Sequence, residues 1–240
     1  MINPVTEVRS FINAALITPV ERDHTESDAA FRRRRVVAAV TLVVGAVTLA
    51  LALRIRPGDP LFYPATLAIA VVWTGGALLS GPLHIGRATT RRATQARPVT
   101  QSLALGLMLL AAFLVGATVL AQVPFLREPV DRLLDHARLG SLALVVAITT
   151  VNGIAEELYF RGALYAGIGR RHAVAGTTVV YALVTAGAGV LMLVFAAAVI
   201  GLVTGLQRRV TGGVLGPVIT HLTWSIGMLL LLPPALDLLR

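Results

Sequence analysis

The sequence predicts an all-α fold, a polytopic bundle of about seven transmembrane helices. Of its 240 residues, 56% are hydrophobic and only 14% are charged, whereas about a quarter of a soluble domain is normally charged. The apolar residues gather into runs, most of them close to the ~20 residues with which a helix crosses a bilayer. All 21 basic residues are arginine, which gives a net charge of +9. We expect an integral protein of a bacterial cytoplasmic membrane.

The first 35 residues are polar and of mixed charge, and we interpret 1–35 as a cytoplasmic N-terminal segment. Its stretch PVTEVRSFINAALI is compatible with a short amphipathic helix. The run FRRRR at 31–35 directly precedes the first apolar segment. Because arginines beside a span set its orientation, we interpret this run as a topology signal. No nucleic-acid partner is expected.

The apolar runs place the N-terminal transmembrane helices within 36–138 and a second group, the core, within 139–240. The fifth and sixth expected spans share one apolar run, interrupted by AGAG at 186–189. Arginine pairs flank this run at 170–171 and at 208–209. A hairpin brings both pairs to one side, as the positive-inside rule prefers. The expected spans are 36–53, 61–82, 102–123, 139–166, 173–188, 190–207 and 214–232.

The arginines also predict the orientation of the bundle. With seven spans, fifteen of the 21 arginines fall on one side and six on the other. The richer side is the cytoplasmic one by the positive-inside rule, so the N-terminus is cytoplasmic and the C-terminus external. The segment 127–138 balances three acids against three arginines and is expected to be an outer loop.

Few ionisable residues lie inside the spans, and such residues indicate function by default. The stretch AEELYFRG contains Glu156, Glu157 and Arg161. Glu157 and Arg161 are four residues apart on a helix and can pair. Glu156 points about 100° away, with Asn152 one turn earlier on its face. Unpaired within its helix, Glu156 is suited to act as a general base toward water.

One histidine lies at depth in the spans, about two turns into the last one. The topology places this residue, His221, in the same leaflet as Glu156 and Arg161. Two structural alternatives stay open at this point. His221 can be a core histidine bonded to a backbone oxygen, and the EE…R cluster can be a salt bridge at a helix end.

The stretch EELYFRG resembles the first motif, Glu-Glu-x-x-x-Arg, of the CPBP (CAAX protease and bacteriocin-processing, or Abi) family of intramembrane metalloproteases. The resemblance extends from about Leu139 to Leu232. His221 occupies the histidine position of the family's third motif, with Ser225 in place of Asn or Asp. In the second motif Tyr181 replaces Phe and Thr185 replaces histidine.

This resemblance implies an endopeptidase that hydrolyses a membrane-associated protein or peptide with a glutamate-activated water. It makes Glu156 and His221 the catalytic residues. It leaves open whether a divalent metal such as zinc takes part, held by Glu156 and His221. The residues in supporting roles are Glu157, Arg161, Thr185, Ser225 and Asn152.

Two other functions stay open. Threonine can hydrogen-bond but cannot exchange protons near neutral pH as imidazole does, so Thr185 favours a catalytically impaired relative that binds or scaffolds membrane partners. A proton-coupled transporter that uses the buried carboxylates as a relay is the third possibility. Repeats or paired broken helices are typical of many transporters, and the sequence shows neither.

Overall fold

The computed structural model describes residues 3–22, 24–56, 59–90, 94–139 and 141–238. The N-terminal half contains α1 (Pro4–Ile12), the π-helix η1 (Asn13–Ile17), α2 (Asp28–Ala52), α3 (Phe62–Ser80), α4 (Val99–Leu120) and α5 (Pro124–Leu139). The C-terminal half contains α6 (Leu142–Glu157), the π-helix η2 (Leu158–Leu164), α7 (Tyr165–Ile168), α8 (Ala173–Ala186), α9 (Leu191–Thr211) and α10 (Leu215–Leu238). A short antiparallel pair, β1 (Ala88–Thr89) and β2 (Gln95–Ala96), lies between α3 and α4.

The predicted all-helical membrane fold is confirmed. In the described part of the chain, six helical segments are long and apolar enough to cross a membrane: α2, α3, α4, the continuous segment from α6 to α7, α9 and α10. The fifth expected span, 173–188, is the shorter helix α8. Its 14 residues extend about 21 Å at 1.5 Å per residue, less than the ~30 Å of a bilayer core.

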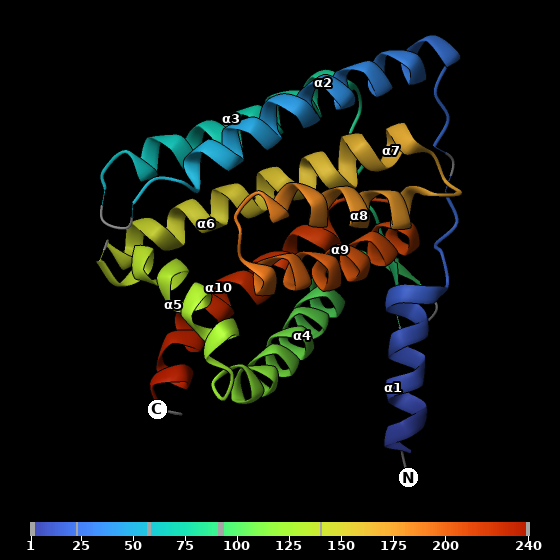
Figure 1. The fold of residues 1–240 in the computed structure, drawn as a ribbon. Coiled ribbons are helices and arrows are strands. Elements are labelled where there is room, and N and C mark those ends of the chain that lie inside the picture. Colours follow the sequence, from blue (N-terminus) through green and yellow to red (C-terminus); the bar gives the residue numbers. More distant parts are fainter. Residues whose placement is uncertain (1–2, 23, 57–58, 91–93, 140, 239–240) are drawn as a thin grey trace.

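The predicted hairpin in the long apolar run is also present. Helices α8 and α9 pack against each other and are joined by a short turn (Figure 1). Gly189 in this turn has a φ of 70°, a left-handed conformation that glycine adopts without steric cost. Arg170 hydrogen-bonds the His24 carbonyl, and Arg209 hydrogen-bonds the Leu16 carbonyl. Both arginine pairs therefore lie at the end of the bundle that the N-terminal segment contacts.

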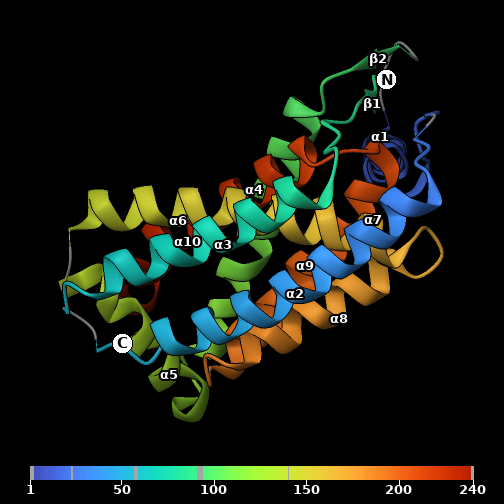
Figure 2. The ribbon, with the colours of Figure 1, turned by 90° about the horizontal axis from the view of Figure 1, so that it is seen from above.

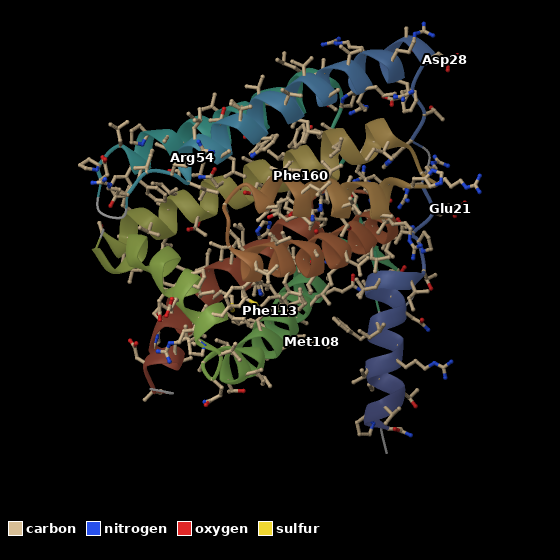
Figure 3. The ribbon with its side chains drawn as sticks, viewed as in Figure 1. Glu21, Asp28, Arg54, Met108, Phe113 and Phe160 are labelled. Atoms are coloured by element: carbon tan, nitrogen blue, oxygen red, sulfur yellow. The ribbon has the colours of Figure 1, made fainter. Side chains whose placement is uncertain are left out.

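The segment from α6 to α7 is central in the bundle. It contacts α2, α3, α8 and α10, while α2 packs on α3 and α4 packs on α10 (Figure 2). Its aromatic side chains build the core, where Trp73 stacks on Tyr159 at 4.5 Å between ring centroids. Phe160 lies between the helices, whereas Asp28 and Arg54 mark opposite ends of α2 (Figure 3).

Helix α2 begins well before the expected span because Ser27 caps it by accepting a hydrogen bond from the Ala30 amide. The FRRRR run is therefore helical. Arg34 within it is buried and pairs with Glu26 at 2.9 Å. It also hydrogen-bonds Ser80 at the end of α3. One arginine of the presumed topology signal thus also holds the ends of two helices together.

The segment 127–138 is not the loop that we expected but part of helix α5. Val130 and Leu134 lie one turn apart and pack with Leu232 and Leu236 of α10. Apolar residues at this spacing, set among charges, give α5 one face that can be buried. The balanced charge of the segment suggested a loop, and its pronounced amphipathic helical periodicity was missed.

The orientation of the bundle in the membrane is a prediction. A reporter domain fused after Arg209 should be cytoplasmic, and one fused after Arg240 should be external, because α10 lies between them. Protease protection in right-side-out vesicles measures this. If both reporters are on the same side, the positive-inside assignment of the last spans is wrong.

Candidate functional site

The two glutamates of AEELYFRG lie where α6 changes into the π-helix η2. Glu157 is the last residue of α6, and η2 carries Arg161. The side chains of Glu157 and Arg161 are fully buried. Short π-helical segments within α-helices occur frequently at functional sites. The change in helix type therefore agrees with the interpretation of this stretch as the functional one.

Glu157 binds two cationic or ionisable partners. Its Oε1 lies 3.1 Å from Nη1 of Arg161, which confirms the predicted contact, and 2.8 Å from Nδ1 of His221 on α10. A carboxylate only accepts hydrogen bonds, so Nδ1 of His221 is the donor. The Nε2 edge of the ring is then left for another partner. The sequence had associated His221 with Glu156, but its hydrogen bond is made to Glu157.

Arg161 is enclosed by aromatic rings and carboxylate. Its guanidinium carbon lies 4.8 Å from the centre of the Tyr181 ring, a cation–π contact. The contact with Glu157 has the distance of an ion pair but not the angles of a hydrogen bond. Within the described residues, the three guanidinium nitrogens and Oε2 of Glu157 make no hydrogen bond. These buried polar atoms therefore keep hydrogen-bonding capacity that the described side chains do not use.

Glu156 is in different surroundings from its neighbour. Its Oε2 accepts a 2.6 Å hydrogen bond from the hydroxyl of Tyr181 on α8. It is also within electrostatic range of His221 and Arg161. The sequence interpretation treated Tyr181 only as a substitute for Phe. It did not anticipate that the Tyr181 hydroxyl donates a hydrogen bond to Glu156. The signal was a phenol inside an apolar helix, since a buried tyrosine hydroxyl usually finds a partner.

Three of the expected supporting residues bond within their own helices. Thr185 donates to the Tyr181 carbonyl at 2.9 Å, and Asn152 donates to the Ile148 carbonyl at 3.1 Å. The hydroxyl of Ser225 lies 3.5 Å from the Leu222 carbonyl. Thr185 is one turn after Tyr181, and Ser225 is one turn after His221. Their recorded bonds link neither Glu156 nor His221.

The side chains at this site do not fit a tightly bound zinc ion. Structural and catalytic zinc sites normally use three or four protein ligands. In the described ranges, no group of three His, Cys, Asp or Glu side chains is placed to hold a metal ion. In addition, the Arg161 cation lies beside the Glu157 carboxylate and opposes a second cation. We therefore derive no chemistry through a metal.

Residues 138–227 match the family model of the Type II CAAX prenyl endopeptidase Rce1-like proteins. This stretch contains Glu156, Glu157, Arg161, Tyr181 and His221. The chain carries an Rce1-like domain. No curated protein and no solved structure matches the chain. The Rce1-like domain extends from the end of α5 into α10, so the family resemblance of the sequence is confirmed over the helices that build the site.

Helices outside the Rce1-like domain also support the site. The hydroxyl of Tyr159 donates to the carbonyl of Ala38 on α2 at 2.6 Å. Trp73 on α3 packs against Tyr159 and Phe160. These contacts fix the rotation of the central segment and thereby the directions in which Glu156 and Glu157 point.

Proposed function

We propose that the Rce1-like domain is an intramembrane endopeptidase that hydrolyses a membrane-associated protein or peptide with a water activated by Glu156. The observation that carries this proposal is the division between two adjacent carboxylates. Glu157 is held by Arg161 and His221, whereas the recorded partner of Glu156 is a neutral hydroxyl. Two neighbouring carboxylates in different environments are typical of sites that give each a separate task.

The chemistry requires a base, a place for developing charge and a proton for the leaving group. Glu156 takes one proton from water, and the water oxygen attacks the carbonyl carbon of the peptide. As the C–N bond breaks, the Glu156 carboxyl gives the proton to the leaving amine. Arg161 is the group suited to polarise the carbonyl oxygen, since such electrostatic stabilisation often contributes most to catalysis. Because Nδ1 of His221 carries the proton, its Nε2 is an acceptor and is suited to orient the attacking water.

Tyr181 has a positioning role in this proposal. Its hydroxyl occupies Oε2 of Glu156 at 2.6 Å, so the carboxylate keeps Oε1 for water. The same ring lies against the Arg161 guanidinium. One side chain of α8 thus contacts both members of the site that α6 and η2 supply, and residues 36–138 serve as the scaffold for the core at 139–240.

Replacing Tyr181 by phenylalanine should change the pH dependence of cleavage while the fold is retained. In the parent, the hydrogen bond from the Tyr181 hydroxyl stabilises the ionised form of the Glu156 carboxylate. Hydrogen bonds to charged groups contribute roughly 1.5–3 kcal/mol, and the variant loses this contribution. The acidic limb of the pH–rate profile should therefore move up by at least about one pH unit. The ring and its contact with Arg161 stay, so the melting temperature should change little. An unshifted limb with unchanged activity would contradict the positioning role.

The scaffold alternative is favoured by one observation: Thr185, at the family's histidine position, bonds only within α8 among its recorded contacts. A double replacement, Thr185→His with Ser225→Asn, completes the family's motif residues at these positions. If the domain is a protease limited by the missing imidazole, cleavage of membrane peptides in detergent should rise by roughly the 10²–10⁴-fold of one acid–base group. If the parent cleaves no peptide of a broad library, and the folded double variant cleaves none either, the scaffold function is favoured.

A further inference from the structure

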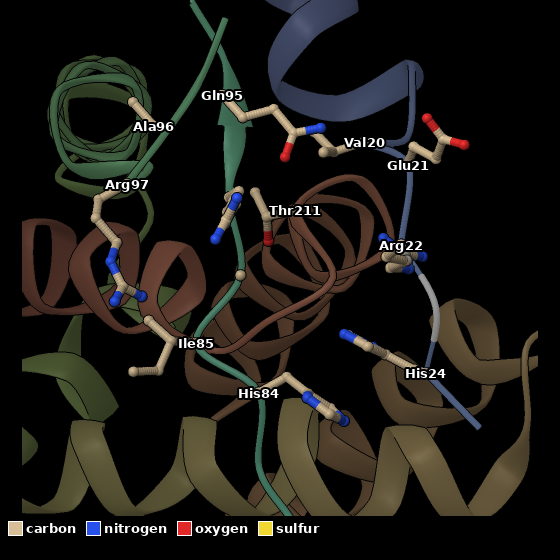
Figure 4. A pocket seen from close by; sticks show the side chains of 12 residues that line it. Val20, Glu21, Arg22, His24, His84, Ile85, Gln95, Ala96, Arg97 and Thr211 are labelled. Carbon is tan, nitrogen blue, oxygen red and sulfur yellow. The ribbon is translucent and has the colours of Figure 1, made fainter. Parts of the chain in front are cut away.

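A cavity of about 630 Å³ opens at the end of the bundle that the N-terminal segment contacts. It is separate from Glu156 and His221, neither of which lines it. Figure 4 shows the side chains of Arg22, His24, His84 and Arg97 around it, contributed by segments far apart in the sequence. Arg87 also lines it, and the acidic residue among the described lining is Glu21. The balance is thus strongly basic.

The walls come from the ends of the membrane-spanning helices. Residues 20–22 and His24 precede α2, residues 84–87 and 95–97 lie between α3 and α4, and Thr211 ends α9. Beside them, α1 runs across the direction of the spanning helices (Figure 1). The cavity therefore lies at the depth where the hydrocarbon core gives way to headgroups. Basic pockets at this depth are known sites for anionic headgroups.

Backbone hydrogen bonds fix the walls to the bundle. The Val20 amide donates to the carbonyl of Val210 at 2.9 Å, and the Arg87 amide donates to the carbonyl of Thr211 at 2.9 Å. Arg22 donates to Val210 as well, at 3.2 Å. These bonds attach both walls to α9. The basic side chains of the lining therefore project from backbone that is hydrogen-bonded to the bundle.

The turn between α9 and α10 closes against the same wall. The amide of Val214 donates to the carbonyl of His84 at 2.9 Å. Gly213 in this turn lies so close to Ile85 that a Cβ atom would overlap its backbone. The glycine is needed for this close approach, and the approach holds His84 at the cavity.

The two histidines stack with ring centroids 3.6 Å apart and an interplanar angle of 10°. Burial, with the nearby charges of His84 and of three arginines, lowers the pKa of His24 to about 4. Burial and Arg208 also lower the pKa of His84. Both rings are therefore neutral at pH 7, when each still has one N–H to donate. The arginines supply the positive charge.

We propose that this cavity is a binding site for a phosphate group, and that its depth favours the headgroup of an anionic phospholipid as the source. Guanidinium groups bind phosphate with charge-assisted, often bidentate hydrogen bonds. Neutral imidazoles add donors without the repulsion that two stacked cations would bring. The site is independent of the hydrolysis assigned to Glu156.

The test uses the full-length protein in neutral detergent. It is titrated with dioctanoyl phosphatidic acid, with dioctanoylglycerol, which lacks the phosphate, and with inorganic phosphate, and binding is measured by thermophoresis. The double variant Arg87→Gln with Arg97→Gln removes two exposed arginines of the lining. At about 1 kcal/mol for each of the two arginines near an anionic surface, phosphatidic acid should bind roughly 30-fold more weakly.

The matched control is Arg54→Gln with Arg56→Gln, which removes the same charge at the other end of α2, where both residues are exposed. This control should bind phosphatidic acid as the parent does. Gln95→Glu, which adds a negative charge to the lining, is a second variant that should also weaken binding. Melting temperatures of all variants establish that they are folded.

The outcomes separate the sources of the phosphate. Phosphatidic acid that binds much more tightly than inorganic phosphate identifies a lipid site, and equal affinities identify a site for free phosphate. Either result, together with selective loss in the lining variants, supports the proposal. Dioctanoylglycerol binding as tightly as phosphatidic acid would overturn it, as would equal losses in the lining variants and the control.

Discussion

Replacing Glu156 by glutamine should lower the rate of peptide cleavage by at least ~10²-fold, the usual contribution of a general acid–base group. Glutamine keeps the size of the side chain and an oxygen that can accept the Tyr181 hydroxyl, but it cannot take a proton from water. The fold should therefore be retained, with a melting temperature close to that of the parent. Initial rates of peptide cleavage in detergent, at matched protein concentration, measure the loss.

A conservative variant sharpens this test. Glu156→Asp keeps a carboxylate but withdraws it by one methylene from the Tyr181 hydroxyl. It should lose part of the activity, because general-base catalysis depends on hydrogen-bond distance to the water. If Glu156→Gln cleaves as fast as the parent, Glu156 is not the base, and His221 with its Nε2 edge becomes the group to test.

Replacing Arg161 by alanine should have the largest effect on stability. It leaves the fully buried Glu157 without its arginine and removes the guanidinium that packs on Tyr181 and Phe160. Removing one partner of a buried ion pair typically costs roughly 3–5 kcal/mol. We expect a clear loss of folded protein on size-exclusion chromatography and a lowered melting temperature.

Arg171→Ala is the matched control. It removes the same charge, but from a residue that is exposed between α7 and α8. Its yield should equal that of the parent. Arg161→Lys keeps the charge but not the planar group that stacks on aromatic rings, and it should fall between the two. If the alanine variants at 161 and 171 are equally stable, the ion pair is not the structural element that we describe.

Local periodicity and charge explain what the sequence could predict. The contact between Glu157 and Arg161 requires only that both lie four residues apart on one helix. The hairpin of α8 and α9 required only that both arginine pairs lie on one side of the membrane. Neither inference depends on how distant helices rotate against each other.

The contacts that the sequence missed all depend on such tertiary rotation. Glu156 and Glu157 differ by about 100° around α6, and nothing in the sequence fixes which of them faces His221 on α10. In the structure His221 is hydrogen-bonded to Glu157, and Tyr181 is hydrogen-bonded to Glu156. The stacking of His24 on His84 likewise joins segments that no spacing rule connects.

The central claim is that this domain breaks peptide bonds with water, and mass spectrometry of the products tests it directly. Purified full-length protein in detergent is incubated with a library of membrane peptides in water enriched in heavy oxygen. The account predicts new C-termini that carry the heavy oxygen in samples of the parent and not in samples of Glu156→Gln. Labelled C-termini that form equally with both proteins would contradict it.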